Sequence, residues 1–255
     1  MWDPDQYLAY ADHRRRPVLD LLARVPTGHV ERIVDLGCGP GQLTELLRQR
    51  WPDATVVGVD HDPAMIERAR AEHAGAGIDY QQADIGQWKP DGPVDLVFSN
   101  AALHWIPGHI DLLARFAGWL SPTGTLAVQV PGNTAAPSHT VLAELRREAA
   151  WQHLVGAGAD DHVLVETPPT YARAIAAAGL SPDAWETTYT QILTGDDPVV
   201  EWLKGSTLRP VLAALEPDDQ TAFLSELARR LRDHYPSEDG RTYFGFRRIF
   251  VVGRA

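Results

Sequence analysis

Short apolar runs alternate with segments of helical spacing through the first half of the chain. Strands are predicted at 33–36, 55–59, 78–82, 94–99 and 125–130. Helices are predicted between them at about 41–50, 64–72 and 110–120. Buried strands that alternate with helices pair in parallel through right-handed crossovers. The pattern therefore predicts an α/β fold built on a mostly parallel sheet.

The regular alternation ends after residue 131. Helical patterns follow at 137–152, 170–178, 198–204 and 218–235, and strand patterns at 185–193 and 242–252. We expect the two late strands to pair as an antiparallel edge, with about 133–167 and 195–240 as insertions. Residues 1–30 precede the first strand and predict two short helices, the second opened by Pro17.

The first apolar run ends in a glycine loop, Ile33-Val34-Asp35-Leu36-Gly37-Cys38-Gly39-Pro40-Gly41. Glycine allows positive φ and close approach of a ligand, and such a loop before a helix is typical of nucleotide binding in α/β folds. The dinucleotide fingerprint would need its third glycine where Gln42 stands. The loop instead resembles motif I of the class I S-adenosylmethionine (SAM)-dependent methyltransferases, an acidic residue followed by alternate glycines. An ordinary strand–helix turn is the alternative for this stretch alone.

Acidic residues follow the next two predicted strands. Asp60 lies at the distance from the glycine loop where an acid accepts both ribose hydroxyls in nucleotide-binding sheets. The same stretch also suits a helix cap, so we assign the ribose role to Asp60 and the cap to Asp62. After the third strand, the methyltransferase resemblance implies that Asp84 faces the adenine amino group and Ile85 packs on the ring. A turn role for Asp84 is the alternative.

The segment after the fourth strand, which begins at Asn100, consists of small residues. The resemblance implies that this segment lies beside the SAM sulfonium and that Cys38 provides a backbone contact. His104 and Trp105 are then candidates for lining the acceptor site, with His104 open as a base or as a packing residue. The predicted cofactor-binding residues are Asp35, Gly37, Cys38, Gly39, Gly41, Asp60, His61, Asp84, Ile85 and Asn100.

Composition narrows the classes of protein to which the chain can belong. The chain has 255 residues, 44% of them hydrophobic, which suffices for one large domain, and a net charge of −11. The acidic balance disfavours nucleic acids and anionic membranes as partners, and no apolar run approaches the length of a membrane span. One cysteine excludes an internal disulfide framework, and the ten histidines show no convincing metal spacing. We therefore expect a cytoplasmic protein without a metal.

Longer motifs outside the glycine loop narrow the resemblance. They are Trp2-Asp3-Pro4, Arg14-x-Arg16-Pro17, Asn100-Ala101-x-Leu103-x-Trp105, Ala127-Val128-Gln129-Val130-Pro131-x-Asn133, Trp185-x-Thr187-Thr188-Tyr189 and Phe246-x-Arg248-Ile249-Phe250. Together with the glycine loop they resemble the bacterial trans-aconitate 2-methyltransferase family over essentially the full chain. The resemblance implies a Rossmann-like class I methyltransferase fold with a mostly parallel seven-stranded sheet and helical lid insertions. In that arrangement 1–30 would form a helical arm over the active site and 31–255 the SAM-binding domain.

The family resemblance implies methyl transfer from SAM to one carboxylate of trans-aconitate, which yields a monomethyl ester and S-adenosyl-L-homocysteine. A carboxylate has a reference pKa near 4 and is ionised at neutral pH, so this reaction requires neither a base nor a metal. Position 104 is His here, whereas the family also places Gln there, which argues against an obligatory proton transfer by His104. Catalysis is then expected to come from proximity, orientation and desolvation of the carboxylate.

Trans-aconitate is a trianion, so we expect cationic side chains at its site. Arginine binds carboxylates bidentately, and tyrosine supplies an O–H donor. Arg247 and Arg248 point to opposite faces of a strand, so at most one of them is expected there, and we select Arg248. The predicted substrate-binding residues are Tyr7, Arg14, Arg16, Arg209, Tyr243 and Arg248. A solvated face for the Arg14–Arg16 run and a helix-end contact for Arg209 are the alternatives.

Three other functions compete with this hypothesis. The same SAM chemistry on another polycarboxylic or natural-product acid would need only a different set of lid arginines. A non-catalytic SAM-binding protein is disfavoured because it would have no use for two insertions around a second ligand. A nucleic-acid methyltransferase is disfavoured by the charge and by Ser99-Asn100-Ala101-Ala102 in place of an N-P-P-Y-type motif. We expect a small-molecule polycarboxylate as the partner and a monomer or homodimer as the assembly.

Overall fold

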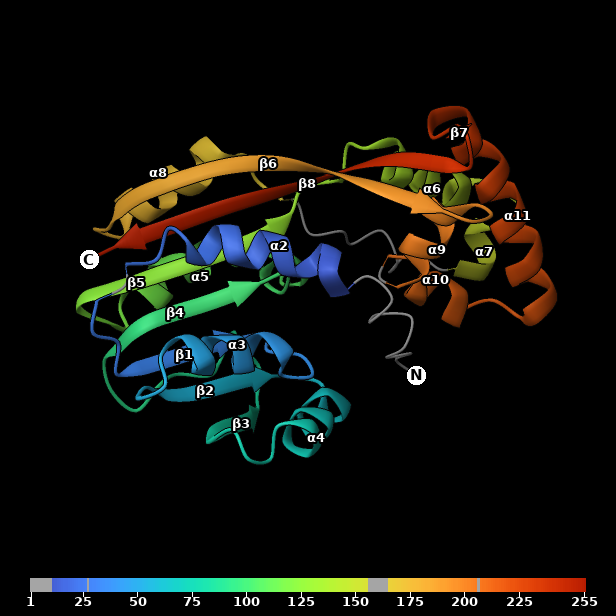
Figure 1. Cartoon of the computed structure of the whole chain (residues 1–255). Coiled ribbons are helices and arrows are strands. Elements are labelled where there is room, and N and C mark those ends of the chain that lie inside the picture. The colour runs from blue at the N-terminus through green and yellow to red at the C-terminus, as the bar shows by residue number, and fades with distance from the viewer. Residues whose placement is uncertain (1–10, 27, 156–164, 206) are drawn as a thin grey trace. The chain divides into compact units, whose positions relative to one another are not determined.

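The computed structural model describes residues 11–26, 28–155, 165–205 and 207–255, with side chains from residue 15 onward (Figure 1). The described residues form two compact units. The first, called the sheet unit here, comprises the described residues of 16–131, 163–186 and 248–255. The second, called the helical unit, comprises the described residues of 1–15, 132–162 and 187–247. The chain passes from one unit to the other within both of its last long strands.

A sheet with strand order β3-β2-β1-β4-β5-β8-β6 organises the chain, and β7 pairs with β8. The strands are β1 Arg32–Leu36, β2 Thr55–Asp60, β3 Ile78–Gln82, β4 Val94–Asn100, β5 Leu120–Pro131, β6 Ser181–Thr194, β7 Ser237–Glu238 and β8 Arg241–Arg254. Strands β1 to β5 pair in parallel, and β8 is antiparallel to β5. The predicted mostly parallel sheet and the pairing of its two late strands are confirmed. The two-residue β7 is an addition to that prediction.

Helices cover both faces of the sheet, as expected when buried strands alternate with helices. The helices of this part are α2 Ala11–Leu22, α3 Gln42–Arg50, α4 Pro63–Glu72, α5 His109–Ala117 and α8 Pro168–Ala177, with the short 3₁₀ helix η1 Leu103–Trp105. On one face the buried side chains of α5 and α8 pack on the apolar side chains of β1, β4 and β5. The opposite face carries α3 and α4, and Tyr80 of β3 packs there against Ile66 of α4. Both layers leave the carboxyl ends of the parallel strands at one edge.

The helix α2 corrects the prediction of two helices divided at Pro17. The helix runs through Pro17, although proline cannot donate the backbone hydrogen bond of a helix interior. Val18, Leu21 and Leu22 on the following turns are at most 1% exposed. Burial of this apolar face offsets the lost hydrogen bond, which local propensity alone does not reveal.

The helical unit contains five helices in its described part. They are α6 Pro137–Arg147, α7 Gln152–Val155, α9 Pro198–Lys204, α10 Arg209–Ala213 and α11 Pro217–His234. Their core is mostly aliphatic and includes an aromatic cluster, in which the ring centroid of Trp202 on α9 lies 5.7 Å from that of Phe244 and 5.4 Å from that of Phe246. Asn133 ties two segments of the unit together: its Oδ1 accepts from the backbone N–H of Arg247 at 2.8 Å, and its Nδ2 donates to the carbonyl of that residue at 3.1 Å. These elements fill the predicted insertions; their role as a lid stays a prediction.

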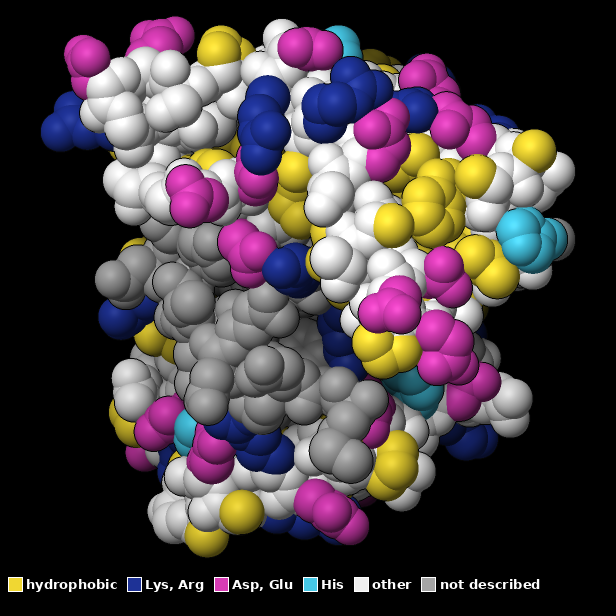
Figure 2. All heavy atoms as spheres, turned by 90° about the vertical axis from the view of Figure 1, so that its right-hand side faces the viewer, with side chains coloured by type: hydrophobic (Ala, Val, Ile, Leu, Met, Phe, Trp, Pro, Cys, Tyr) yellow, Lys and Arg dark blue, Asp and Glu magenta, His cyan; other side chains and the backbone are white. Residues whose placement is uncertain are grey.

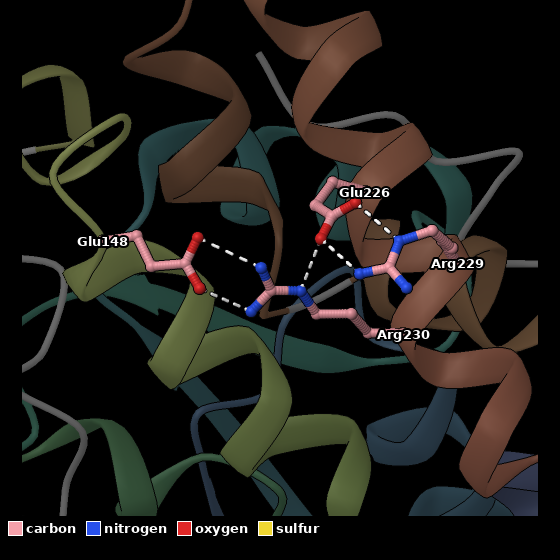
Figure 3. A network of polar contacts seen from close by, with 4 residues as sticks. All are labelled: Glu148, Glu226, Arg229 and Arg230. Carbon is pink, nitrogen blue, oxygen red and sulfur yellow. Dashed lines mark hydrogen bonds and ion pairs between the residues drawn. The ribbon is translucent and has the colours of Figure 1, made fainter.

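An ion-pair network joins the end of α6 to α11 in the helical unit (Figure 3). The predicted helix over 137–152 ends early, because the backbone of Glu148 is already extended. Both carboxylate oxygens of Glu148 accept from the guanidinium of Arg230, at 2.6 and 3.1 Å. Arg230 also donates to Glu226 at 2.7 Å, and Arg229 binds the same carboxylate. The hydrogen bonds from Arg229 and Arg230 lower the pKa of Glu226 to about 2, so the network stays ionised at neutral pH.

Charge of both signs covers the face shown in Figure 2. Among the described side chains of this face, Asp and Glu lie beside Lys and Arg near the top of the view, and several Asp and Glu lie next to one another at the right. Among the described residues, no helix combines the length and apolarity that a membrane crossing requires.

Candidate active site

The glycine loop lies between β1 and α3, and all three of its alternate glycines have positive φ: 78° at Gly37, 54° at Gly39 and 88° at Gly41. A Cβ at Gly37 would meet the Cβ of Ala102 at 2.1 Å, and one at Gly41 would meet the hydroxyl of Tyr80 at 2.5 Å. A Cβ at Gly39 would meet nothing within 4 Å. The outer two glycines are therefore required by close packing within the protein, and Gly39 leaves open space at the main chain.

Asp60, the last residue of β2, holds the glycine loop in place. Its Oδ2 accepts from the backbone N–H of Gly39 at 2.9 Å, and its Oδ1 accepts from that of Asp62 at 3.0 Å. The exposed His61 places its Nδ1 3.4 Å from the same carboxylate. Asp62 caps α4 by accepting from the N–H of Ala64 at 2.9 Å, which confirms the predicted cap. Each Asp60 oxygen keeps a further lone pair, so the ribose role stays compatible with these contacts and stays a prediction.

Asp35 lies on β1 directly beneath the glycine loop and is 2% exposed. The hydroxyl of Thr44, on α3, donates to its Oδ2 at 2.7 Å. Burial raises the pKa of Asp35 to about 7, although the Thr44 hydrogen bond opposes the shift, and the neighbouring charge of Asp60 adds to it. The carboxyl is therefore poised between its protonated and ionised forms at neutral pH. A cationic ligand group bound nearby would favour the ionised form.

Cys38 lies inside the loop and is 6% exposed. Burial, with the nearby carboxylates of Asp35 and Asp60, raises the pKa of its thiol, and the thiol contacts the carbonyl of Gly39 at 3.6 Å. Since the thiolate is the nucleophilic form, this environment opposes nucleophilic chemistry at Cys38. Within the described ranges, no group of three or more His, Cys, Asp or Glu side chains has a metal-binding arrangement.

Asp84 and Ile85 follow β3 as predicted. The exposed Asp84 uses its Oδ1 to accept from the N–H of Gly86 at 2.8 Å and its Oδ2 to accept from the amide of Gln87 at 3.3 Å. This is the turn role named as the alternative, and it leaves the outer side of the carboxylate in solvent. Ile85 is 7% exposed and packs in the sheet core. Their proposed contacts with adenine stay predictions.

The segment after β4 folds back over the glycine loop. Ala101 has a φ of 54°, and its N–H donates to the carbonyl of Gln129 on β5 at 2.9 Å. Asn100 is half-buried, and its Oδ1 is a buried acceptor that finds no hydrogen-bond partner among the described residues. The rings of His104 and Trp105 lie 4.7 Å apart, and Trp105 is 53% exposed. The predicted acceptor-site residues thus lie at the carboxyl edge of β4.

Of the predicted substrate-binding residues, Arg248 lies in the sheet unit at this edge. It is 7% exposed on β8, and its Nη1 lies 3.4 Å from Oε1 of Gln129. Arg16 also belongs to the sheet unit and is exposed on α2. Arg248 is therefore the predicted cation that the structure brings beside the end of β5.

Two of the other predicted substrate residues belong to the helical unit, and two fall outside the described side chains. Arg209 begins α10 and Tyr243 lies 46% exposed on β8, and both belong to the helical unit. Tyr7 and the side chain of Arg14 lie outside the described residues. The substrate role of these four residues stays a prediction.

The structure adds two polar residues to the predicted site, Thr44 and Gln129. Gln129 is fully buried and interrupts the apolar run of β5, and a buried polar residue inside a central strand is informative in itself. Thr44 is also fully buried, although it lies in the first turn of a helix where a hydroxyl is ordinary. The sequence therefore carried a usable signal for Gln129 and none for Thr44.

Known proteins resemble this chain both in its sheet unit and over its full length. The family model described as "Methyltransferase domain" matches residues 33–124, from β1 into β5. The trans-aconitate 2-methyltransferase of Streptomyces avermitilis is 48% identical over 257 residues, which cover 98% of this chain and 96% of that protein. The chain belongs to the trans-aconitate 2-methyltransferase family. The enzyme of that name from Rhodococcus jostii is 47% identical over 256 residues, which cover 100% of this chain and 99% of that protein, so this family resemblance extends through the helical unit as well.

Solved structures share the fold of this family member. A putative methyltransferase from Bacillus halodurans has a TM-score of 0.62 at 18% identity, covering 92% of this chain and 97% of that one. An O-methyltransferase from Brevibacillus brevis, solved with S-adenosyl-L-homocysteine, has a TM-score of 0.56 at 15% identity, covering 99% of this chain and 77% of that one. These likenesses confirm the predicted class I methyltransferase fold.

Proposed function

We propose that the protein transfers the methyl group of SAM to a carboxylate of trans-aconitate and forms its monomethyl ester. The observation that carries the proposal is a family relationship at 48% identity over almost the whole of both chains, with the predicted loop and acids at one sheet edge. At this identity and coverage, the helical unit is shared as well as the sheet, and the sheet alone would fit many acceptors. The acceptor is therefore proposed from the full chain.

The residues at the carboxyl edge fit SAM. The open side of Gly39 leaves space for a ligand at the main chain, and Asn100 offers a buried acceptor that no described residue uses. Asp60 would hold the ribose, and the carboxylates of Asp60 and Asp35 suit a ligand that carries positive charge. When bound, SAM supplies an electrophilic methyl group on a sulfonium.

Proton transfer has no part in the proposed chemistry. The attacking carboxylate is ionised at neutral pH, so the residues near it have to bind, orient and exclude water rather than act as a base. We propose that His104 and Trp105 line the acceptor side and that Arg248 binds a carboxylate of the acid. Cationic contacts at the carboxylates that are not methylated would orient the acid and leave the attacking oxygen without a competing hydrogen bond.

Arg248→Ala separates substrate binding from cofactor binding. We expect it to raise KM for trans-aconitate roughly tenfold or more, since a charge-assisted contact is lost, while the Kd for SAM changes little. Arg16 is the second predicted arginine of the sheet unit and is exposed on α2. Arg16→Ala tests its substrate role by the same two measurements. An unaltered KM in Arg248→Ala removes that residue from the substrate site.

A transfer assay with methyl-labelled SAM tests the function. The purified protein is offered trans-aconitate, cis-aconitate, citrate and isocitrate, and the products are identified by mass spectrometry. A methyl ester formed preferentially from trans-aconitate is the expected result. Transfer only to another acid would retain the chemistry and replace the substrate, and SAM binding without transfer to any acid would refute the proposal. A cytoplasmic location, a monomer or homodimer, and the absence of nucleic-acid and membrane partners remain predictions.

A further inference from the structure

Gln129 is a buried polar residue that the proposed chemistry has not yet used. It lies on β5, two residues before the strand ends, and it is 0% exposed. Its Oε1 faces Nη1 of Arg248 at 3.4 Å, and its Nε2 has no hydrogen-bond partner among the described residues. A guanidinium can only donate, so the atom that faces Arg248 has to be the oxygen of the amide. This contact therefore fixes the orientation of the amide and leaves its NH2 group as the unsatisfied part.

The register of the sheet shows what lies beside this NH2 group. Asn100 of β4 pairs with Gln129, and Gln129 pairs in turn with Phe250 of β8. Residues directly opposite one another share a face of the sheet, and Arg248 shares that face because it lies two residues from Phe250. Asn100, Gln129 and Arg248 therefore form a polar row across three adjacent strands. Asn100 adds a second buried atom, its Oδ1, without a described partner.

A buried amide donor without a partner is unfavourable in a folded protein unless a ligand satisfies it. The polar row offers the NH2 group of Gln129 and the guanidinium of Arg248 as donors, and both are groups that bind carboxylates. An apolar wall bounds the row, because the ring of Trp185 stacks on that of Phe250 with centroids 4.8 Å apart and planes 6° from parallel. Donors beside this aromatic pair suit a planar carboxylate.

We propose that Gln129 is a substrate-binding residue that donates from Nε2 to a carboxylate of the polycarboxylic acid, while its Oε1 orients Arg248 toward the same acid. The identity of the acid rests on the proposed function. Gln129 then acts twice, as a neutral donor that adds no positive charge and as an acceptor that orients the guanidinium. A carboxylate held by these two groups is already fully hydrogen-bonded, so it is a carboxylate that is not methylated.

Two substitutions separate the two roles. Gln129→Leu keeps the approximate size and removes both polar atoms. Gln129→Glu keeps an oxygen for Arg248 and replaces the donor by an anion, which the guanidinium beside it keeps ionised. If the amide only orients Arg248, Gln129→Glu binds the acid more tightly than Gln129→Leu does, because it keeps the oxygen that orients the guanidinium. If Nε2 donates to the acid, Gln129→Glu loses binding at least as strongly as Gln129→Leu, since like charges then face one another.

The experiment is calorimetric titration of trans-aconitate into protein saturated with S-adenosyl-L-homocysteine, so that binding is measured without turnover. We expect Kd for the acid to rise roughly ten- to hundredfold in both variants, as for the loss of a hydrogen bond to a charged group, with Kd for S-adenosyl-L-homocysteine unchanged. Thr125→Val is the matched control, because Thr125 is a buried polar residue on the same face of β5, four positions before Gln129. It should leave both affinities unchanged.

Three outcomes would overturn the inference. They are tighter binding of the acid by Gln129→Glu than by Gln129→Leu, a parallel loss of S-adenosyl-L-homocysteine binding in both variants, and a wild-type protein that does not bind trans-aconitate. Failure of the proposed function has a different signature. In that case the wild type binds the acid in this titration, the variants lose it, and no methyl ester forms when SAM replaces S-adenosyl-L-homocysteine.

Discussion

Replacement of Asp35 by Asn should make the protein more stable at alkaline pH. Asp35 is 2% exposed, and its pKa is raised from 3.8 to about 7. The difference between these two pKa values corresponds to ~4 kcal/mol between the two protonation states, since tenfold in a proton equilibrium is about 1.36 kcal/mol. Because the folded pKa is raised, the stabilising contribution is fully present below the unfolded pKa and is lost as the pH rises through about 7. Asparagine keeps the shape and the Thr44 hydrogen bond but does not titrate.

Urea unfolding at pH 5 and pH 8 measures this effect. Of the ~4 kcal/mol, roughly 2.5 kcal/mol falls between these two pH values, so the stability of Asp35→Asn relative to wild type should rise by up to that amount from pH 5 to pH 8. The same relative stability at both pH values would refute the reasoning, since it would mean that Asp35 titrates alike in the folded and unfolded chain.

Asp95 provides a control, because its pKa is shifted in the direction opposite to that of Asp35. Burial alone would raise the pKa of this carboxyl, but hydrogen bonds from Ser121 and from the backbone of Glu31 and Arg32 lower it below 3.8. Its contribution is therefore present above the unfolded pKa and is lost only as the pH falls below it. Asp95→Asn should destabilise the protein by the same amount at pH 5 and pH 8, which separates a specific effect of Asp35 from a general effect of pH.

The remaining predictions concern the loop, the ribose site and the core. Gly37→Ala should lower the urea midpoint further than Gly39→Ala, because a left-handed alanine costs ~1–2 kcal/mol at either position and only Gly37 also meets a side chain at 2.1 Å. Gly39→Ala should nevertheless bind SAM more weakly. Equal urea midpoints for the two variants would contradict the packing role of Gly37, and native SAM affinity in Gly39→Ala would contradict the ligand-facing role of Gly39. Asp60→Ala should raise the calorimetric Kd for SAM roughly tenfold or more, and unchanged affinity would remove Asp60 from the site. Tyr171→Phe should cost ~1–3 kcal/mol in urea unfolding, because the 2.6 Å partner of the buried His109 ring is lost; an unshifted midpoint would show that the pair does not stabilise the fold.

The parallel sheet was predictable because each of its strands is an apolar run bounded by turn residues. Such runs are almost continuous when both faces are covered by helices, as in β1 and β4. The five-residue α10 and the two-residue β7 escaped prediction, since neither is long enough to show a period. In α2, burial outweighed the local signal of Pro17, which no local rule could show.

The candidate site was predictable where function depends on neighbours in the sequence. The glycine loop and Asp60 follow from spacing, because the loop has to turn between a strand and a helix at a fixed place. Contacts between distant segments could not be predicted from spacing in the sequence. Gln129 and Arg248 are 119 positions apart, and only the antiparallel register of β8 on β5 brings them together. The sequence marked Gln129 as unusual in an apolar strand without indicating which cation it meets.

The distribution of charge along the carboxyl edge suits the two ligands of opposite charge that the proposed function requires. Asp35 and Asp60 lie on β1 and β2, and Gln129 and Arg248 on β5 and β8. With strands about 4.8 Å apart, the step from β2 to β5 spans about 14 Å. A cationic donor is favoured at the acidic end, where a polycarboxylate would be repelled, and the acid is favoured at the other end, where a sulfonium would be repelled. On the proposed function, each ligand would be positioned partly by repulsion from the other ligand's side of the edge. The two would then meet at the carboxyl end of β4, which Asn100 ends and His104 follows.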